Sequence, residues 1–549
     1  MLSKFYKSFT KKEHLLFISA TVCFFASGIF IFSLFISNKT IKIPANGGTY
    51  TEGIVGQPQY IIPILAKSGT PDQDLSDLIY SNLTDLSQSI KNDNQFRTWT
   101  VRLKDGVKWH DGSPITSDDI IFTIHTIQNP DSLSPLFLDW QNITTSRISE
   151  REIEFKISSS YSLFPNLLKN LYPIPKKTFA DIAPANIRMS IYKLEPIGSG
   201  PYKFSNIEKR NDGFVSSISL KENEYYSSIK DLPYIKTINI KFYENEEKII
   251  SAYNRGAIDG FGTGNQSTIS SISLGSSIKD ISTSKYYALF FNSNANSALS
   301  SIPLKKALSL AIDKEEIIKD AFINHASIAN GPIPSSLSSF NPEVNDYYSF
   351  NPEQSIKTLY ENGFDLSNDQ SYWIKDGKKI VLTIKTPDVP TLNQTAKIIK
   401  KQWEAIHIPT TIISIDPQKI NDEIVKTRDY EILLFGNIVS LEPELFSFWH
   451  SSEKFYPGLN LSFFDNAIAD NQIMSLRKIS IDDQQRQKTL NLIQENIVSS
   501  YSTIFLVSPN YFYIHRNNIP GIKIQTISNS SDRFNQISSW YLKTKRQLK

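Results

Sequence analysis

The stretch Leu15–Ser37 constrains this 549-residue chain more than any other feature. Its 23 residues carry no charge, and at about 1.5 Å rise per residue a helix of that length crosses the ~30 Å hydrocarbon core of a bilayer. Basic residues flank it on both sides: Lys4, Lys7, Lys11, Lys12, Lys39 and Lys42. Their bias favours a cytoplasmic tail (1–14) and an extracytoplasmic main domain. We therefore interpret 15–37 as a single-pass anchor in the lipid membrane and 38–46 as a linker.

A cleaved signal peptide is the competing interpretation of this stretch. Such a peptide has an apolar region of about 7–15 residues that ends at a small-x-small site. Here the apolar run continues well beyond Ala26, and no good site follows. Cys23 is no convincing lipid-attachment site, because Val22 precedes it where a small residue is needed. Cys23 is also the sole cysteine, so the main domain holds no disulfide.

Composition narrows the function classes. With 58 basic and 55 acidic residues the net charge is +3, and 40% of the residues are hydrophobic, which excludes a disordered chain. No basic stripe with interleaved aromatic residues occurs, so we expect no nucleic-acid partner. The length exceeds what one hydrophobic core supports, so we expect more than one domain.

Turn and cap signals place helices and strands along the chain. Two Asp-Gly pairs, 105–106 and 111–112, predict tight turns after a strand at 94–103. Thr116, Asp313 and Asn351 each precede an apolar-periodic segment and predict helix starts. Strand-like runs lie between these helices, at 216–220, 237–242, 380–385 and 431–435. The alternation predicts an α/β or mixed class with more than one sheet.

Read in order, several motifs resemble the peptide/nickel family of bacterial extracellular solute-binding proteins, family 5. The longest is WTVRLKDGVKWHDGSPITSDDIIFT at 99–123. The others follow in the family's order at 196–202 (PIGSGPY), 255–259 (RGAID), 291–292 (FN), 303–313 (PLKKALSLAID), 331–334 (GPIP) and 351–364. Each motif alone is weak, but together they cover roughly residues 47–545.

The resemblance implies a periplasmic-binding-protein-like type II (cluster C) fold, a two-lobed clamshell with an inserted subdomain. Lobe 1 would combine 47–66, 195–286 and 500–549, with the inserted subdomain at 67–194. Lobe 2 would be 287–499. Two crossing segments would form a hinge, and a ligand would be enclosed between the lobes.

The ligand-facing residues also come from the resemblance. On one side of the cleft they would be Ser68, Gly69 and Thr70. On the other side the family's peptide-binding members carry G-W-x-x-D-x-x-D/E-P, whose first aspartate pairs with the peptide's amino terminus. The matching stretch here supplies five candidates: Phe435, Gly436, Asn437, Val439 and Glu442.

This stretch departs from the family's pattern at two positions. Gly436 stands where the tryptophan would be, and Val439 where the aspartate would be. A buried ammonium needs a carboxylate partner. Either Glu442 or another acid takes over, or the ligand lacks a free amino terminus, or Glu442 is merely structural before Pro443.

Catalytic and metal chemistry find no support. His110 and Asp111 are adjacent, so a strand would point them to opposite faces, and we expect a supporting role in a turn. Ser199 lacks the flanking glycines of a nucleophile elbow. We expect no enzyme, no cofactor and no metal site.

The resemblance implies a binding protein for a peptide-like small solute that works with ABC permease and ATPase subunits. We expect a monomer. Two alternatives remain open: a non-peptide ligand, such as an oligosaccharide or a metal chelate, and a ligand sensor.

Overall fold

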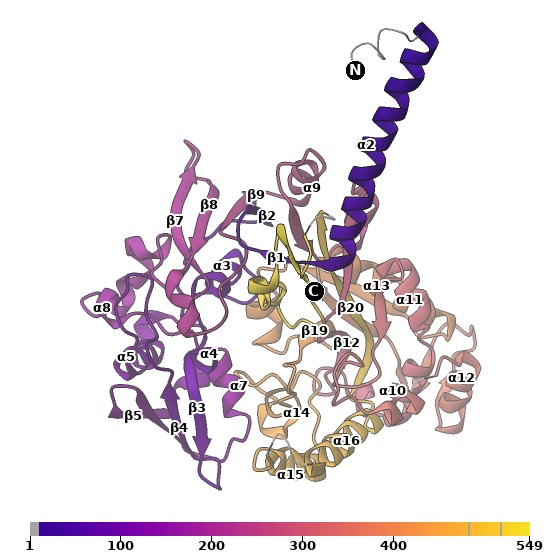
Figure 1. Cartoon of the computed structure of the whole chain (residues 1–549). Helices are drawn as coiled ribbons and strands as arrows, with labels where there is room; N and C mark the ends of the chain where they lie inside the picture. Colours follow the sequence, from indigo (N-terminus) through magenta and orange to yellow (C-terminus); the bar gives the residue numbers. More distant parts are fainter. Residues whose placement is uncertain (1–9, 348, 481–483, 517–518, 549) are drawn as a thin grey trace.

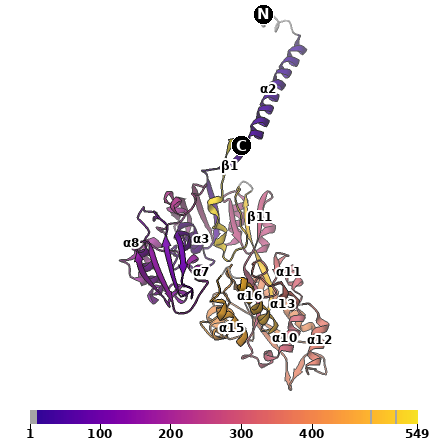
Figure 2. The same ribbon diagram turned by 60° about the horizontal axis from the view of Figure 1, so that its bottom comes forward.

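The computed structural model describes residues 10–347, 349–480, 484–516 and 519–548. Two lobes lie side by side, and one long helix, α2 (Lys11–Lys39), projects away from both (Figure 1). Turning the molecule leaves this helix still clear of the lobes (Figure 2). The chain therefore has the predicted two-lobed α/β architecture, preceded by one apolar helix.

The helix α2 begins at a capping box. The Thr10 hydroxyl accepts the Glu13 N–H, and the Glu13 carboxylate accepts the Thr10 N–H at 2.7 Å. Within the described residues it is the one helix long and apolar enough to cross a membrane, and none of its most apolar window is buried against the protein. A helix that is apolar on every side needs an apolar surrounding. An anchor and a signal sequence both meet this description.

The first lobe is built on a mixed sheet with the strand order β20-β10-β2-β9-β8-β7, and β11 pairs with β20. The strands β9, β2 and β10 run parallel, with α9 between β9 and β10 in the chain. The elements of this lobe are β2 (Thr49–Val55), α3 (Pro71–Ile79), β7 (Tyr202–Lys209), β8 (Val215–Glu222), β9 (Thr237–Tyr243), α9 (Glu246–Asn254), β10 (Gly260–Thr263), β11 (Ser276–Ser282) and β20 (Thr503–Arg516).

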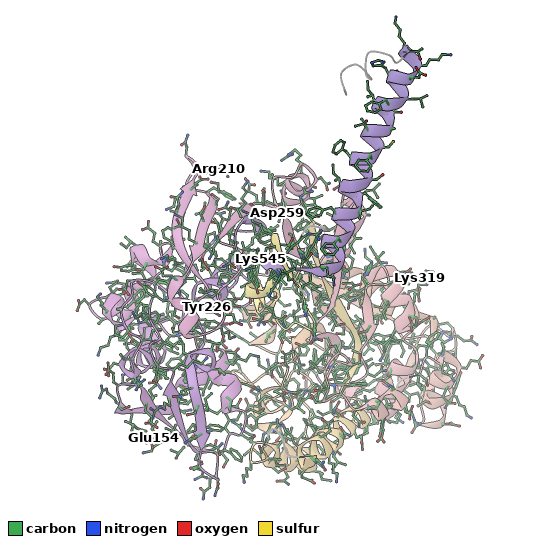
Figure 3. All side chains as sticks on the ribbon, in the orientation of Figure 1. Glu154, Arg210, Tyr226, Asp259, Lys319 and Lys545 are labelled. Carbon is green, nitrogen blue, oxygen red and sulfur yellow. The ribbon has the colours of Figure 1, made fainter. Side chains whose placement is uncertain are left out.

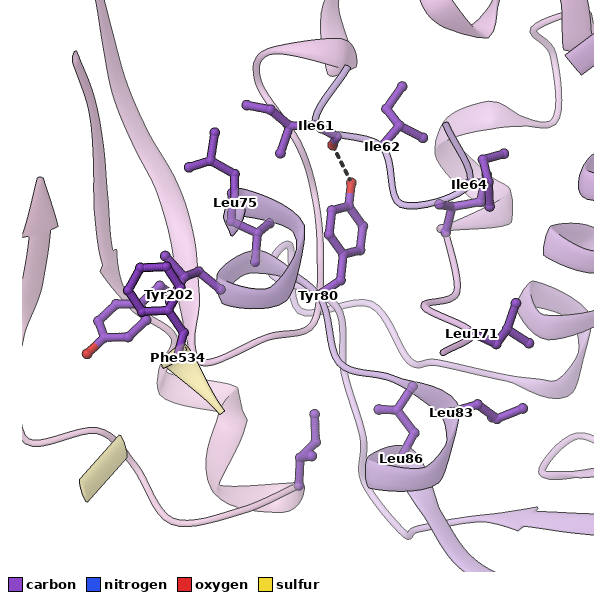
Figure 4. Packing of buried hydrophobic residues seen from close by; sticks show 14 of the residues in the cluster. Ile61, Ile62, Ile64, Leu75, Tyr80, Leu83, Leu86, Leu171, Tyr202 and Phe534 are labelled. Atoms are coloured by element: carbon purple, nitrogen blue, oxygen red, sulfur yellow. Dashed lines mark hydrogen bonds between the residues drawn. The ribbon is translucent and has the colours of Figure 1, made fainter. Parts of the chain in front are cut away.

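A separate antiparallel sheet, of order β3-β4-β6-β5, forms the subdomain that follows α3. Its elements are α4 (Leu83–Leu86), β3 (Ser87–Asn92), β4 (Thr98–Leu103), α5 (Ser117–Gln128), α6 (Phe137–Trp140), β5 (Ile143–Ser149), β6 (Glu152–Ile157), α7 (Phe164–Lys169) and α8 (Lys176–Phe179). One hydrophobic core runs through this subdomain and the first lobe. Figure 4 shows the junction, where the Tyr80 hydroxyl donates to the Ile61 carbonyl at 3.4 Å. The subdomain is therefore packed onto the first lobe.

The second lobe has two hydrophobic cores, one on each side of its sheet β18-β17-β19-β12. Its strands are β12 (Lys285–Phe291), β13 (Ala326–Ile328), β14 (Asp365–Leu366), β15 (Trp373–Lys375), β16 (Lys378–Lys379), β17 (Leu382–Pro387), β18 (Thr410–Ile415) and β19 (Ile432–Ile438). Its helices are α10 (Ile302–Leu310), α11 (Lys314–Phe322), α12 (Pro352–Glu361), α13 (Pro390–Ala405), α14 (Phe446–Trp449), α15 (Ala467–Leu476) and α16 (Gln484–Ser499). The predicted helix starts at Asp313 and Asn351 are confirmed, because both side chains accept N–H groups of the first turn.

Two strand segments cross between the lobes. The first half of β20 pairs with β12 and β13 of the second lobe, and its second half pairs with β10 and β11 of the first. Thr283 and Ser284 make the other crossing, between β11 and β12. The sheets therefore change over near 283–284 and 508–510. The lobe boundaries expected from the sequence, 286/287 and 499/500, stay predictions.

Candidate ligand cleft between the lobes

A cavity of about 330 Å³ lies where the two crossings meet. The first lobe lines it with Ser68, Gly69 and Gln266, and the second lobe with Lys285, Tyr287 and Phe322. The crossing residues Thr283 and Pro509 also belong to its wall. Because its walls come from both lobes, a hinge motion would open or close this cavity.

The predicted first-lobe residues divide between two cavities. Ser68 and Gly69 line the cavity between the lobes, and the Ser68 hydroxyl donates to the Asn529 side chain. Gly69 has φ +74°, and a side chain there would meet open space. Thr70 lies in a different hollow of about 590 Å³, between the first lobe and its subdomain, and its hydroxyl donates to the Lys67 carbonyl at 2.7 Å. The structure thus brings two of these three residues to the cleft.

The predicted second-lobe residues alternate in direction along β19. Gly436 pairs with Tyr287, a cavity residue, so its face of the strand is the cleft face. Asn437 points the other way, and its side-chain amide donates to the Tyr286 hydroxyl at 3.0 Å. Phe435 is half-buried against one core of this lobe.

Val439 and Glu442 lie outside the cavity wall. Val439 is 5% exposed and belongs to the core, and its N–H donates to the Ser284 carbonyl at 2.9 Å. Glu442 is exposed at the surface. A ligand contact by either residue stays a prediction.

Sequence reasoning missed the aromatic side chains of the cavity and its one charged side chain, Lys285. Tyr511 fits only because Gly262, on the neighbouring strand β10, has no side chain, since a Cβ there would lie 1.8 Å from the Tyr511 hydroxyl. Burial raises the pKa of Tyr511, which keeps the phenol neutral. Lys285 and Tyr287 lie two residues apart on one face of β12, next to the crossing. The alternation of residues along the strand could have indicated that Lys285 and Tyr287 share one face, but not that this face is exposed to the cleft.

A buried ionic network supports the cleft wall from behind. Arg533 donates through Nε to Glu52 at 2.9 Å and through both terminal nitrogens to Asp74 at 3.0 and 2.8 Å. The hydroxyls of Tyr50 and Tyr513 donate to the other Glu52 oxygen at 2.6 and 2.9 Å. The network therefore ties β2, α3 and the C-terminal segment together. That segment also supplies cleft residues 527–530.

His110 has the supporting role expected of it. Its Nδ1 accepts the Gly198 N–H at 3.2 Å, and its Nε2 lies 3.2 Å from the Gly200 carbonyl. This geometry fixes a neutral ring that accepts at Nδ1 and donates at Nε2. Burial lowers the pKa of His110 to about 4. Two of the motifs quoted above, 99–123 and 196–202, thus pack directly on each other.

Within the described ranges, no group of three or more His, Cys, Asp or Glu side chains could hold a metal ion. The cleft holds polar, aromatic and aliphatic side chains around the two crossing segments. Such a site suits reversible capture of a solute between two lobes.

This fold and site define a two-lobed solute-binding protein. Residues 61–455 match the model of the bacterial extracellular solute-binding proteins, family 5. That match spans more than half of the chain, so the protein belongs to this family.

Several characterised proteins share the fold over nearly the whole chain. The oligopeptide-binding protein AppA of Bacillus subtilis is 24% identical over 526 residues, which are 92% of this chain and 94% of AppA. Its structure in complex with a nonapeptide superposes with a TM-score of 0.71 at 22% identity, covering 91% of this chain and 100% of that one. The ABC transporter substrate-binding protein CtaP of Listeria monocytogenes gives a TM-score of 0.75 at 23% identity, covering 90% and 99%. NikZ of Campylobacter jejuni in complex with Ni(L-His) gives 0.70 at 21% identity, covering 90% and 99%.

Proposed function

We propose that this protein is the membrane-anchored, extracytoplasmic solute-binding component of an ABC importer and that it captures peptide-like solutes. The observation that carries the proposal is the cavity between the lobes at the two crossings, in a chain of family 5. Ligand contacts from both lobes exist together only when the lobes are closed, so binding favours closure. The closed form would be recognised by a permease with its ATPase subunits.

The apolar helix α2 supports the anchor. None of its most apolar window packs on the protein, and it continues without a gap into the ordered strand β1 (Thr40–Ala45). In this proposal the main domain acts as a monomer beside the membrane. Catalysis has no role in it, since the family is one of solute-binding proteins.

A peptide ligand is favoured by the similarity to AppA, whose structure holds a nonapeptide. Polar backbone-directed contacts and roomy side-chain pockets suit a peptide of variable sequence. The second candidate is a non-peptide solute such as a metal chelate, which the fold of the Ni(L-His)-bound NikZ accommodates.

Native mass spectrometry of the purified full chain in detergent tests the peptide assignment, through the mass and fragmentation of any co-purified ligand. Calorimetric titration with one peptide in acetylated and free-amine forms then tests the cleft chemistry. If Val439 takes the place of the aspartate that peptide-binding members of the family carry, acetylation should change the dissociation constant by less than ~tenfold. A large preference for the free amine that Glu442→Gln abolishes would show that Glu442 anchors the amino terminus. Binding of a sugar or a chelate, with no peptide bound, would contradict the peptide assignment.

A further inference from the structure

The charge in the wall of the cavity between the lobes is positive. Of the residues that line the cavity between the lobes, Lys285 alone carries a charge, and none is Asp or Glu. The carboxylates behind the wall are engaged elsewhere, since Glu52 and Asp74 both pair with Arg533. A ligand that enters this cavity therefore meets a cation with no carboxylate beside it.

Lys285 is held toward the cavity by its neighbours. Its ammonium lies 4.5 Å from the centre of the Tyr287 ring, two residues further along the same face of β12. Among the residues that the structure describes, no carboxylate lies within ion-pair distance of it. The ring gives the ammonium a weak partner and leaves its hydrogen-bond donors available.

Gly436 makes room for this arrangement. A Cβ at position 436 would lie 2.9 Å from Tyr287 Cε1 and 3.0 Å from Lys285 Cε. A side chain at 436 would therefore displace both cleft residues. The stem of Lys285 therefore takes up the space that a side chain at position 436 would need.

We propose that Lys285 binds a carboxylate or an equivalent anionic group of the ligand. For a peptide this means that the cleft anchors the C-terminal or an acidic end, in place of the amino end. The inference rests on the proposed solute-binding function. An unpaired ammonium enclosed on closure is costly, and an anionic ligand group removes that cost. Lys285 stands directly after the crossing residues 283–284, so ligand charge acts at the hinge itself.

The experiment titrates full-length protein in detergent with four versions of one neutral peptide pool: free, N-acetylated, C-amidated and doubly blocked. Amidation should weaken binding at least ~tenfold, and acetylation should weaken it less. Lys285→Met should remove the effect of amidation, and Lys285→Arg should retain it. Lys397→Met is the matched control, because Lys397 is exposed on α13 and is not among the residues that line the cavity. Melting temperatures check that each variant is folded.

Each outcome decides the proposal. Equal binding of amidated and free-acid peptides, or an amidation effect that survives Lys285→Met, overturns it while the peptide function stands. If no peptide binds, citrate and gluconate serve as anionic probes beside glucose as the neutral one. Binding of the anions that Lys285→Met abolishes then supports the lysine's role and removes the peptide assignment. Binding of glucose alone, or of none of these probes, contradicts the proposed role of Lys285.

A different surface carries a second, independent inference. The C-terminal strand β21 (Lys543–Leu548) pairs residue by residue with β1, which directly follows α2. This basic ribbon, β1 with β21, carries four cations and no acidic residue: Lys42, Lys543, Lys545 and Arg546. A fifth cation, Lys39, stands next to it at the end of α2. Figure 3 shows Lys545 near the domain end of α2.

The ribbon lacks an internal counter-charge. Lys42 lies directly opposite Arg546, and like charges across a strand pair destabilise it. β21 is exposed along its whole length. If α2 spans the bilayer, the ribbon lies at the level of the headgroups. We infer that it docks on anionic phospholipid headgroups and so orients the lobes toward the membrane.

Full-length protein in nanodiscs tests this inference. In a Cys23→Ala background, a spin label at Gln547→Cys reports access of an aqueous relaxation agent. Access should fall at least ~threefold when phosphatidylglycerol replaces ~30% of the phosphatidylcholine, and high salt should restore it. Replacing the three β21 cations by Gln should abolish the fall. The matched control replaces Lys375, Lys378 and Lys379 of the β15–β16 hairpin. Equal access in both lipids overturns the inference, and failure to enter nanodiscs overturns the anchor on which it depends.

Discussion

Removing the Arg533 guanidinium tests how the first lobe is held together. Arg533 is 2% exposed and makes three bonds to Glu52 and Asp74, which lie 481 and 459 residues away in the chain. Burial opposes the charge of Arg533, but the carboxylates and Tyr511 outweigh it and raise its pKa well above the usual range. The variant Arg533→Met keeps the length of the side chain and leaves two buried carboxylates without their cation.

The expected loss is about 3–5 kcal/mol in the free energy of unfolding, the typical cost of removing one partner from a buried ion pair. Its pH dependence has a definite sign. Burial already raises the pKa of Glu52 in the intact protein, and without Arg533 this folded-state pKa rises further. A group with a raised folded pKa contributes stability below its unfolded pKa, and the contribution is lost as pH rises through the folded value. The variant should therefore be least stable, relative to the intact protein, at high pH.

Urea denaturation measures the loss in the free energy of unfolding. Hydrogen exchange then measures the same loss locally, in the segment 528–540. Arg210→Met is the matched control, because Arg210 also bonds two carboxylates, Asp212 and Glu244, but at the surface. That variant should leave the unfolding midpoint nearly unchanged. A loss of the same size in both variants, or a loss at Arg533 that grows toward low pH, would refute the reasoning.

Two further predictions concern single positions, and a third concerns the helix α2. The pKa of His110 is about 4 in the folded protein and about 6.5 in the unfolded chain, so the free energy of unfolding should fall by about 2 kcal/mol as the pH falls from 7.5 to 5. His110→Gln should lose this pH dependence, and calorimetry that finds it unchanged contradicts the prediction. Gly436→Val should weaken ligand binding at least ~tenfold with a small change in melting temperature, because it displaces Lys285 and Tyr287; unaltered affinity would count against the cleft face of β19. The full chain should sediment with membranes, and a chain starting at Asn46 should not; recovery of freely released protein cut near residue 27 or 37 would identify a signal peptide instead.

Local signals in the sequence were sufficient for much of the fold. Asp313 and Asn351 each cap a helix whose first N–H groups their own side chains satisfy, so three or four adjacent residues determine the start. The turn around His110 was also predictable, although its partners Gly198 and Gly200 were not.

The site depends on contacts that no local pattern encodes. Tyr511 lies over Gly262 because β20 and β10 are neighbours in the sheet. Val439 was singled out by its place in a motif, yet its side chain belongs to the core. Val439 directly follows β19, whereas Lys285, the residue that carries the cleft's charge, is the first residue of β12.

The crossings explain why the cleft chemistry gathers at these residues. A hinge absorbs its motion in a few residues at the ends of elements. Here Ser284 donates its N–H to the Ile527 carbonyl and accepts the Val439 N–H, both at 2.9 Å. A hinge motion at this crossing would therefore have to preserve or exchange these bonds, while Lys285, next in the chain, would move with the second lobe. A ligand group bound to Lys285 and to the 527–530 segment would connect the two sides of the hinge directly, so its binding energy would favour closure without passing through either core.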